Sequence, residues 1–214
     1  TRWNEKFVGP LLNNDILLCE MPRLFYVTTK CILMSSKNRK NVITKIEDIN
    51  IENYDWLVDF SEANISKKIT KLFLSNSKNV ISGTTGLTFD ELNDFCILAK
   101  NNDAKYIHRV NFAKSFCEFE AIAKKIAQKM DHNILIESHD FKKLDKPSGS
   151  ALRLMHVLKL KSSDILAIRG DETTPYHSLI SSNKNERIII THQILDKNAF
   201  VEGFLEVFLK EAGV

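Results

Sequence analysis

Hydrophobic residues in the first half of the chain alternate between short continuous runs and stretches with helical spacing. The runs at 56–60 and 80–82 have the length of buried strands, and 106–112 is typical of a third strand followed by a turn. Between them, apolar positions recur every three or four residues over 65–73 and 89–100, as in amphipathic helices. Strands that alternate with helices predict right-handed crossovers and a parallel sheet.

The pattern changes in the second half of the chain. A long helical repeat over 116–130 precedes a strand-like run at 133–138 and a short helix after Pro147. Three further strand candidates follow with little helix between them, at 165–168, 177–181 and 187–194. This order predicts an open, mixed or largely antiparallel sheet in a second domain, followed by a final helix over 198–212.

Composition and charge exclude several classes of protein. A hydrophobic fraction of 43% excludes a disordered chain, and no apolar run is long enough to span a membrane. We expect no secretory signal, and the four cysteines have no metal or redox spacing, so we expect reduced thiols and a cytoplasmic protein. The net charge of +3 is scattered along the chain, so we expect neither a nucleic-acid nor a membrane partner.

The loop at 83–86, Gly-Thr-Thr-Gly, is a first candidate site. It follows a predicted strand and precedes a helix that begins near Thr88, with Glu91 placed to complete a capping box. Backbone N–H groups and hydroxyls at a helix N-terminus bind phosphates and polar cofactor groups. A plain turn between strand and helix explains the same residues equally well.

The segment 137–151, ESHDFKKLDKPSGSA, holds the strongest candidate. His139 and Lys143 lie four residues apart after a predicted strand, and both types of side chain transfer protons. Ser148 is a natural N-cap for the following helix, and a helix N-terminus beside cationic groups suits a carboxylate-bearing substrate. A capped helix after a solvated charged loop is the alternative. We expect no metal, because no cluster has metal-ligand spacing in the sequence.

Taken in order, these residues resemble the dihydrodipicolinate reductase (4-hydroxy-tetrahydrodipicolinate reductase) family of diaminopimelate and lysine biosynthesis. The segment 137–151 nearly reproduces the family pattern E-x-H-H-x-x-K-x-D-x-P-S-G-T-A. Further matches lie at 58–61, 83–86, 111–112, 169–170 and 186–192, and at His177, Phe200 and Gly203; Arg169 and His177, which flank a polar loop, are weaker site candidates by themselves. The similarity covers roughly residues 55–212 and implies an enzyme that reduces 4-hydroxy-tetrahydrodipicolinate, a small dicarboxylate, to tetrahydrodipicolinate with NADH or NADPH.

The resemblance assigns roles to particular residues. It implies that His139 is the acid/base group and Lys143 the proton donor. It also implies that Gly149 and Ser150 hold a substrate carboxylate, with Asp140 nearby in the substrate site. The implied cofactor-binding residues are Gly83, Thr84, Thr85, Arg109, Val110, Asn111 and Phe112.

The family architecture implies an α/β fold with two domains. Residues 1–112 are expected to form a Rossmann-type, parallel-sheet nucleotide domain, completed by the C-terminal helix within 196–214. Residues 113–195 are expected to form an α+β domain with an open mixed sheet that binds substrate and builds a homotetramer. The catalytic site is expected in the cleft between the domains, and residues 28–30 are expected to set the choice between NADH and NADPH.

Two departures from the family pattern leave alternatives open. Asp140 stands where the family has a second histidine, so it either weakens binding of a dianionic substrate or pairs with Lys142 or Lys143. The N-terminal G-x-x-G-x-x-G loop is missing, and residues 1–50 contain only Gly9. We favour a loop left out of the sequence shown over a reduced, non-catalytic homologue that keeps a dicarboxylate pocket. A nicotinamide reductase acting on another carboxylic acid is a third possibility.

Overall fold

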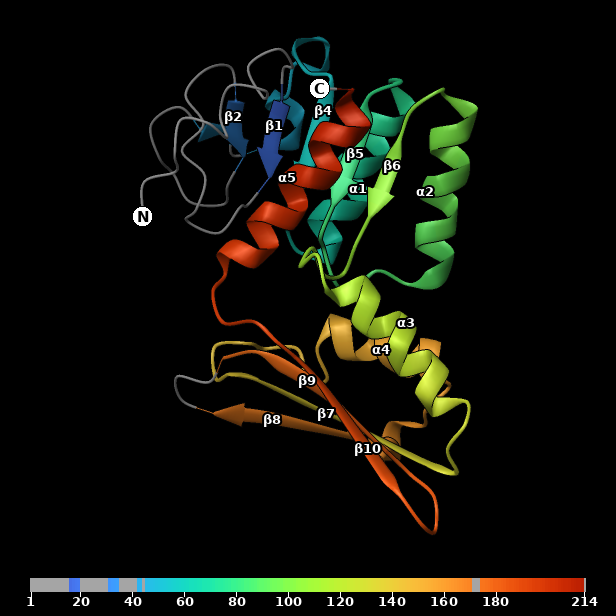
Figure 1. Cartoon of the computed structure of the whole chain (residues 1–214). Coiled ribbons are helices and arrows are strands. Elements are labelled where there is room, and N and C mark those ends of the chain that lie inside the picture. The colour runs from blue at the N-terminus through green and yellow to red at the C-terminus, as the bar shows by residue number, and fades with distance from the viewer. Residues whose placement is uncertain (1–15, 20–30, 35–41, 44, 171–173, 214) are drawn as a thin grey trace. The chain divides into compact units, whose positions relative to one another are not determined.

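The computed structural model describes residues 16–19, 31–34, 42–43, 45–170 and 174–213. The chain divides into two compact units, each with its own sheet and helices (Figure 1). The first unit comprises Thr1–Arg109 with Phe208–Val214, and the second comprises Val110–Val207. Gly9, the one glycine in the region where the G-x-x-G-x-x-G loop is missing, lies outside the described residues. Positions 28–30, which are expected to set the nucleotide preference, also lie outside them.

The first unit is built on a six-stranded sheet of parallel pairings. Its strands are β1 (Ile16–Cys19), β2 (Cys31–Met34), β3 (Val42–Ile43), β4 (Trp56–Asp59), β5 (Asn79–Ser82) and β6 (Tyr106–His108). Their order in the sheet, β3-β2-β1-β4-β5-β6, is that of doubly wound dinucleotide-binding domains and reverses between β1 and β4. Ligands of such sheets bind outside the carboxyl ends of the strands near this reversal.

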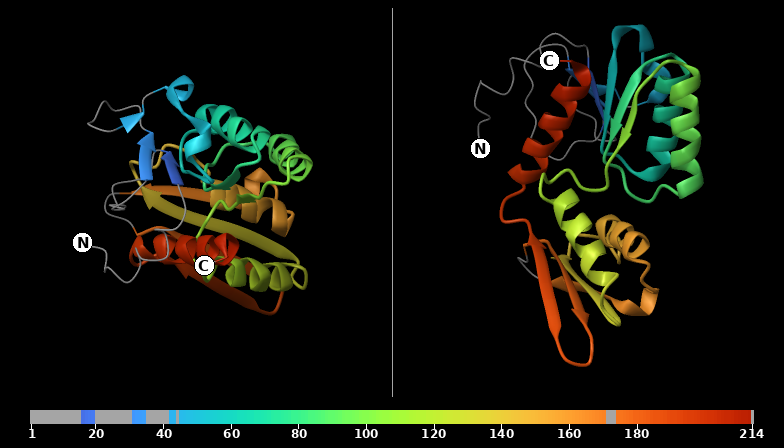
Figure 2. Two further views of the ribbon diagram at one scale, coloured as in Figure 1. Left: turned by 90° about the horizontal axis from the view of Figure 1, so that it is seen from above. Right: turned by 45° about the vertical axis from the view of Figure 1, so that its right-hand side comes forward.

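Helices cover the sheet of the first unit. Helices α1 (Ala63–Ser75) and α2 (Phe89–Asn101) pack side by side on one face, where Leu57 and Val80 meet Phe73 (Figure 2). On the other face, the ring of Trp56 lies 5.2 Å from that of Phe208, near the end of α5 (Asn198–Ala212). Because both faces are covered, β4 is buried at every position. Two short 3₁₀ helices, η3 (Ile46–Asp48) and η4 (Ile51–Asn53), precede it.

The second unit carries the mixed sheet that the sequence predicts. Its strands are β7 (His132–Asp140), β8 (Ile165–Gly170), β9 (Tyr176–Ser182) and β10 (Arg187–Gln193), in the order β10-β9-β7-β8. Only the β7–β8 pairing is parallel among these strands. Helices α3 (Phe116–Ala127) and α4 (Gly149–Leu158) pack on one face, and the 3₁₀ helix η5 (Ser162–Asp164) leads into β8.

Most predicted elements from residue 55 onward are confirmed, and of the strand and turn expected over 106–112 the strand part ends at His108. Its last ladder bond is donated by the Arg109 amide to the Ser82 carbonyl. The side chain of Asn111 then accepts a hydrogen bond from the Ala113 amide, 2.9 Å away, and this local turn competes with strand pairing. No described helix is long and apolar enough to cross a lipid bilayer.

Candidate active site

The carboxyl end of β7 supplies the central residues of the candidate site. Side chains alternate along a strand, so Leu135, Glu137 and His139 share one face. Leu135 is buried in the core of the second unit, which fixes that face toward α3 and α4. Glu137 follows with no exposed surface, and His139 lies at the edge with a side chain 12% exposed. Packing of the apolar part of β7 therefore places the two polar groups.

Strand register brings two more polar residues to this point. Arg169 of β8 lies opposite His139, and His177 of β9 lies opposite Glu137. The ring centroids of His139 and His177 are 5.5 Å apart. Three neighbouring strands therefore bring four ionisable side chains together.

Glu137 is the centre of this cluster. Its Oε1 accepts hydrogen bonds from Nη1 of Arg169 at 2.8 Å and from the Ser148 amide at 3.3 Å. Its Oε2 lies 2.6 Å from Nδ1 of His139. Burial raises the pKa of Glu137, but the hydrogen bonds from His139, Arg169 and Ser148 outweigh it and lower the pKa to about 2. Glu137 is therefore a carboxylate at neutral pH.

His177 has the opposite character. Burial, with a smaller contribution from nearby His139, lowers the pKa of His177 to about 3, so its imidazole is neutral. Its Nε2 lies 3.4 Å from Oγ of Ser148, and its ring packs edge-on against Phe116. His177 therefore borders the cluster as a buried, uncharged side chain.

The loop after β7 carries the predicted lysine. Lys143 is about one-third exposed, and its Nζ lies 2.8 Å from Oδ1 of Asp145. The other carboxylate oxygen of Asp145 accepts a hydrogen bond from the Gly149 amide at 3.2 Å. Ser148 caps α4 as predicted, accepting a hydrogen bond from the Ala151 amide. Asp145 thus links the lysine to the start of α4.

Asp140 forms a turn. Its Oδ1 accepts a hydrogen bond from the Lys142 amide at 2.6 Å, and its carbonyl accepts one from the Lys143 amide at 3.0 Å. Asp140 therefore engages the backbone of these lysines, whereas the ammonium of Lys143 is paired with Asp145.

Part of the second predicted cofactor segment lies against the start of α4. Oγ of Ser150 accepts a hydrogen bond from Nδ2 of Asn111 at 3.3 Å and lies 3.5 Å from the carbonyl oxygen of Val110. Phe112 is buried, with its ring 5.6 Å from that of Phe204. Arg109 is exposed.

The first predicted cofactor loop is fixed to the ends of two strands of the first unit. Thr84 is buried, and its hydroxyl donates to Oδ2 of Asp59 at 3.0 Å. The Gly83 amide donates to the carbonyl of Asp59, while Thr85 is only partly buried. The following Gly86 has φ of +85°, a conformation that favours glycine. The hydroxyl of Thr84 therefore holds the loop in place, and Gly83 and Thr85 are more accessible.

Asp59 itself is a buried carboxylate with many donors. Its Oδ1 accepts from the amide and hydroxyl of Ser61, and its Oδ2 accepts from the hydroxyls of Ser66, Ser82 and Thr84. This network joins β4, α1, β5 and the loop after β5. In the sequence, the position of Asp59 directly after the apolar residues 56–58 was the available signal that its carboxyl group is buried and hydrogen-bonded.

Glu137 was not assigned a role among the predicted site residues, and Arg169 and His177 were only weaker candidates that matched the family pattern. Period-two alternation along β7 was a signal for Glu137, because it shares a face with His139. Arg169 and His177 lie far from His139 in the chain, and only the strand register brings them close.

Glu137, His139 and His177 also place metal-ligand atoms within 4.8 Å of one another. The guanidinium of Arg169 already supplies positive charge 2.8 Å from Glu137, and Ser148 contacts both Glu137 and His177. The positive charge of the guanidinium would oppose the binding of a divalent cation at this cluster. The cluster is thus better suited to hold and move protons.

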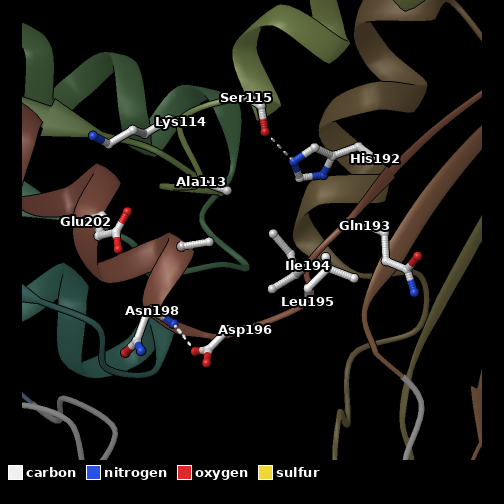
Figure 3. Close-up of a pocket in the computed structure, with 11 residues that line it drawn as sticks. Ala113, Lys114, Ser115, His192, Gln193, Ile194, Leu195, Asp196, Asn198 and Glu202 are labelled. Carbon is white, nitrogen blue, oxygen red and sulfur yellow. Dashed lines mark hydrogen bonds between the residues drawn. The ribbon is translucent and has the colours of Figure 1, made fainter. Parts of the chain in front are cut away.

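A separate hollow of about 500 Å³ lies beside His192 (Figure 3). Nε2 of His192 lies 3.1 Å from the hydroxyl of Ser115, and Asp196 accepts a hydrogen bond from the Asn198 amide. His192 is buried and its ring packs against those of Phe116 and Phe119. Two polar groups of the lining are paired in this way, and the hollow brings together fewer ionisable side chains than the Glu137 cluster, so it is the weaker candidate.

Comparisons with known proteins point to one family. The family model described as "Dihydrodipicolinate reductase, N-terminus" matches residues 27–112, and "Dihydrodipicolinate reductase, C-terminus" matches residues 113–213. The 4-hydroxy-tetrahydrodipicolinate reductase of Buchnera aphidicola subsp. Cinara cedri is 28% identical over 232 residues, covering 94% of this chain and 80% of the relative. That of Methanocaldococcus jannaschii is 30% identical over 177 residues, covering 71% of this chain and 64% of the relative.

A solved structure shares the fold. The dipicolinate-bound dihydrodipicolinate reductase from Paenisporosarcina sp. TG-14 superposes with a TM-score of 0.65 at 16% sequence identity. The match covers 96% of this chain and 90% of that one.

Proposed function

The chain belongs to the dihydrodipicolinate reductase family, and we propose that it reduces 4-hydroxy-tetrahydrodipicolinate to tetrahydrodipicolinate in diaminopimelate and lysine biosynthesis. The observation that carries this proposal is the Glu137–His139–Arg169 cluster beside Lys143, at the carboxyl end of β7. The 4-hydroxyl group of the substrate would leave as water, and NADH or NADPH, when bound, would supply a hydride to the unsaturated ring that results. The residues of the second unit supply the accompanying proton.

His139 and Lys143 have the chemistry for this proton transfer. The Nδ1 of His139 faces Glu137, so its Nε2 is the atom available to a substrate. Lys143 is partly exposed on a loop, and its ammonium can both donate a proton and neutralise negative charge that develops on the ring. We propose Lys143 as the proton donor and His139 as the acid/base group beside it.

The start of α4 is the proposed site for a substrate carboxylate. Backbone amides at a helix N-terminus favour an anion, and the hydroxyl of Ser150 adds a donor. The Gly149 amide already holds a carboxylate, that of Asp145. We propose that a carboxylate of the substrate binds at Gly149 and Ser150, close to the turn formed by Asp140.

The first unit is the proposed nucleotide-binding part. Its strand order and the loop at 83–86, which follows the carboxyl end of β5, suit a dinucleotide. Gly83 and Thr85 are partly exposed there, while Thr84 fixes the loop through Asp59. The residues proposed to hold the nucleotide are Gly83, Thr84, Thr85, Arg109, Val110, Asn111 and Phe112. NADH and NADPH both remain candidates.

We further propose a cytoplasmic homotetramer that assembles through the sheet of the second unit. The face of this sheet opposite α3 and α4 carries exposed apolar side chains, among them Ile134, Leu166 and Ile189. Apolar patches of this kind are typical of protein–protein contacts. In the proposed division, 1–112 with 196–214 bind nucleotide, and 113–195 bind substrate and assemble.

The first test is a fluorescence titration of the protein with NADH and with NADPH, alone and with pyridine-2,6-dicarboxylate. Nucleotide binding that the dicarboxylate tightens is expected, and the tighter nucleotide is the preferred one. Turnover of 4-hydroxy-tetrahydrodipicolinate is then followed by the loss of reduced-nicotinamide absorbance. Dicarboxylate binding without nucleotide binding or turnover would contradict the proposed function and leave a non-catalytic pocket.

A further inference from the structure

We infer that the buried Glu137–Arg169 pair positions both proton-transferring side chains, His139 through the Glu137 carboxylate and Lys143 through backbone carbonyls held by Arg169. This inference rests on the proposed function, because that function makes His139 and Lys143 the reacting groups. Neither Glu137 nor Arg169 has to touch the substrate. Both are positioning residues.

The first half of the argument concerns His139. Ionised Glu137 has no proton to donate, so the 2.6 Å contact between its Oε2 and Nδ1 of His139 requires that Nδ1 carries the proton. The neutral imidazole is then held in one tautomer, with Nε2 unprotonated. Glu137 has no exposed surface and is anchored by Arg169 and Ser148, so it cannot rotate away easily. One nitrogen of His139 is thereby reserved for exchange with the substrate.

The second half concerns the loop that carries Lys143. The guanidinium of Arg169 donates from Nε to the Lys143 carbonyl at 3.2 Å and from Nη2 to the Asp145 carbonyl. Its Nη1 donates to Glu137. One planar, buried group therefore connects the lysine loop to the carboxylate that holds His139. A lysine at this position has no matching fork of donors, so Arg169→Lys keeps the charge and loses the geometry.

A buried ion pair is expensive to desolvate, so its presence alone does not argue for a gain in stability. Here Oε1 of Glu137 accepts hydrogen bonds from Arg169 and Ser148, and Oε2 lies 2.6 Å from Nδ1 of His139. Arg169 also donates to the carbonyls of Lys143, Asp145 and Ile168, and the first two belong to the loop that carries the predicted lysine. This distribution of contacts is what a positioning role requires.

The test compares Glu137→Gln and Arg169→Lys with the control Arg187→Lys, an exposed arginine on β10 of the same sheet. We expect both variants to lose activity mainly in kcat, by about 10- to 100-fold, the size typical of residues that orient reacting groups. KM for the nucleotide should stay near the wild-type value, and Arg187→Lys should match the wild type. A lower melting temperature with unchanged kcat in either folded variant would overturn the inference.

A spectroscopic readout does not depend on activity. Long-range ¹H–¹⁵N spectra recorded at about pH 9, where histidine is ordinarily neutral, report which ring nitrogen carries the proton. We expect His139 of the wild type to be protonated at Nδ1 and Glu137→Gln to show a mixture of tautomers. Protonation at Nε2 in the wild type would overturn the inference even if neither variant folds.

The two measurements separate this inference from the proposed function. A wild-type protein without reductase activity contradicts the proposed function. An active wild type whose His139 tautomer and kcat are insensitive to Glu137→Gln contradicts the positioning role alone.

Discussion

Lys143, on an accessible loop, and His139, near the carboxyl end of β7, are held in position by different contacts. Lys143 depends on one ion pair with Asp145 and on the backbone contact from Arg169, whereas His139 is held by the packing of β7 and by its contact with Glu137. A side chain that is only partly held keeps the freedom to approach a bound substrate. A substitution of Lys143 should therefore remove the proposed reacting group with little effect on the stability of the fold.

We expect Lys143→Ala to lower kcat by about 10²- to 10⁴-fold, the usual size of a general acid's contribution. Nucleotide affinity should remain near normal, because the side chain belongs to the proposed substrate site. Steady-state kinetics and a nucleotide titration check the two parts. The exposed neighbour Lys142 provides the control, and Lys142→Ala should keep its activity. A Lys143→Ala enzyme with near-wild-type turnover would rule out the assignment.

Acid should destabilise the protein through His177 before it does so through Glu137. The pKa of His177 is about 3 in the fold and near 6.5 in the unfolded chain, so unfolding takes up a proton below pH 6.5. For Glu137 the corresponding values are about 2 and 4.5, so its contribution is lost only below pH 4.5. Between pH 6.5 and 4.5, His177 should therefore cost about 1.4 kcal/mol of unfolding free energy per pH unit.

Denaturant unfolding at several pH values measures this slope in the wild type and in His177→Gln. The variant should be less stable at neutral pH, because the ring packs against Phe116, but its stability should fall less steeply with acid. His132→Gln, at an exposed position on β7, should keep the wild-type slope. Equal slopes in the wild type and His177→Gln would assign the effect to other groups. Burial also lowers the pKa of His192, which adds a slope of the same sign in every variant.

At the scale of elements, sequence periodicity was sufficient for most of the described chain. Helix α2 begins at Phe89 with the capping box of Thr88 and Glu91, and β7 through β10 lie where the apolar runs predicted strands. These signals are local, so they can be recognised without knowing the fold. The cluster around Glu137 was not predictable in this way, because it depends on which strands become neighbours and in what register.

Gly203 of helix α5 lies so close to the backbone of Phe112 that a larger residue is disfavoured there, although glycine has a low helix propensity. A Cβ at Gly203 would lie 1.7 Å from the carbonyl oxygen of Phe112. Alanine normally stabilises a helix relative to glycine by roughly 0.5–1 kcal/mol. We expect Gly203→Ala to do the opposite and destabilise the protein by about 1–3 kcal/mol, because backbone must move to admit the methyl group. Thermal unfolding measures this change.

An exposed position on the same helix gives the comparison for Gly203→Ala. Glu202→Ala should change stability little. A Gly203→Ala protein as stable as the wild type would mean that α5 and the segment around Phe112 separate without cost.

At the scale of the whole molecule, the outer face of the second sheet is the feature left unexplained by a single chain. Ile134 and Ile189 both lie opposite Ile180 in the strand register, which makes an apolar row across three strands. Ile189 is 57% exposed. Such a row, placed on the face away from α3 and α4, is well suited to burial by further copies of the chain.

We expect Ile189→Asp to dissociate the proposed homotetramer, because burying an unpaired carboxylate at an apolar contact is costly. Sedimentation velocity measures the assembly, and far-ultraviolet circular dichroism checks that the subunit remains folded. Leu144→Asp, at a loop position that is 94% exposed, should leave the assembly intact. A wild type that sediments as a monomer, or an Ile189→Asp protein that remains a tetramer, would contradict this interface.

Asp145 gives the substrate a competitor that is part of the protein. Its carboxylate contacts both the ammonium of Lys143 and the Gly149 amide, the two groups proposed to receive substrate and its negative charge. A dicarboxylate entering the site must therefore displace an anion that is already there, at very high local concentration. Exchange of one carboxylate for another leaves Lys143 and the Gly149 amide in contact with an anion throughout. The binding affinity measured for a substrate then reflects the difference in free energy between the contacts of the substrate carboxylate and those of Asp145. In the absence of substrate, Asp145 is the counter-ion of the Lys143 ammonium.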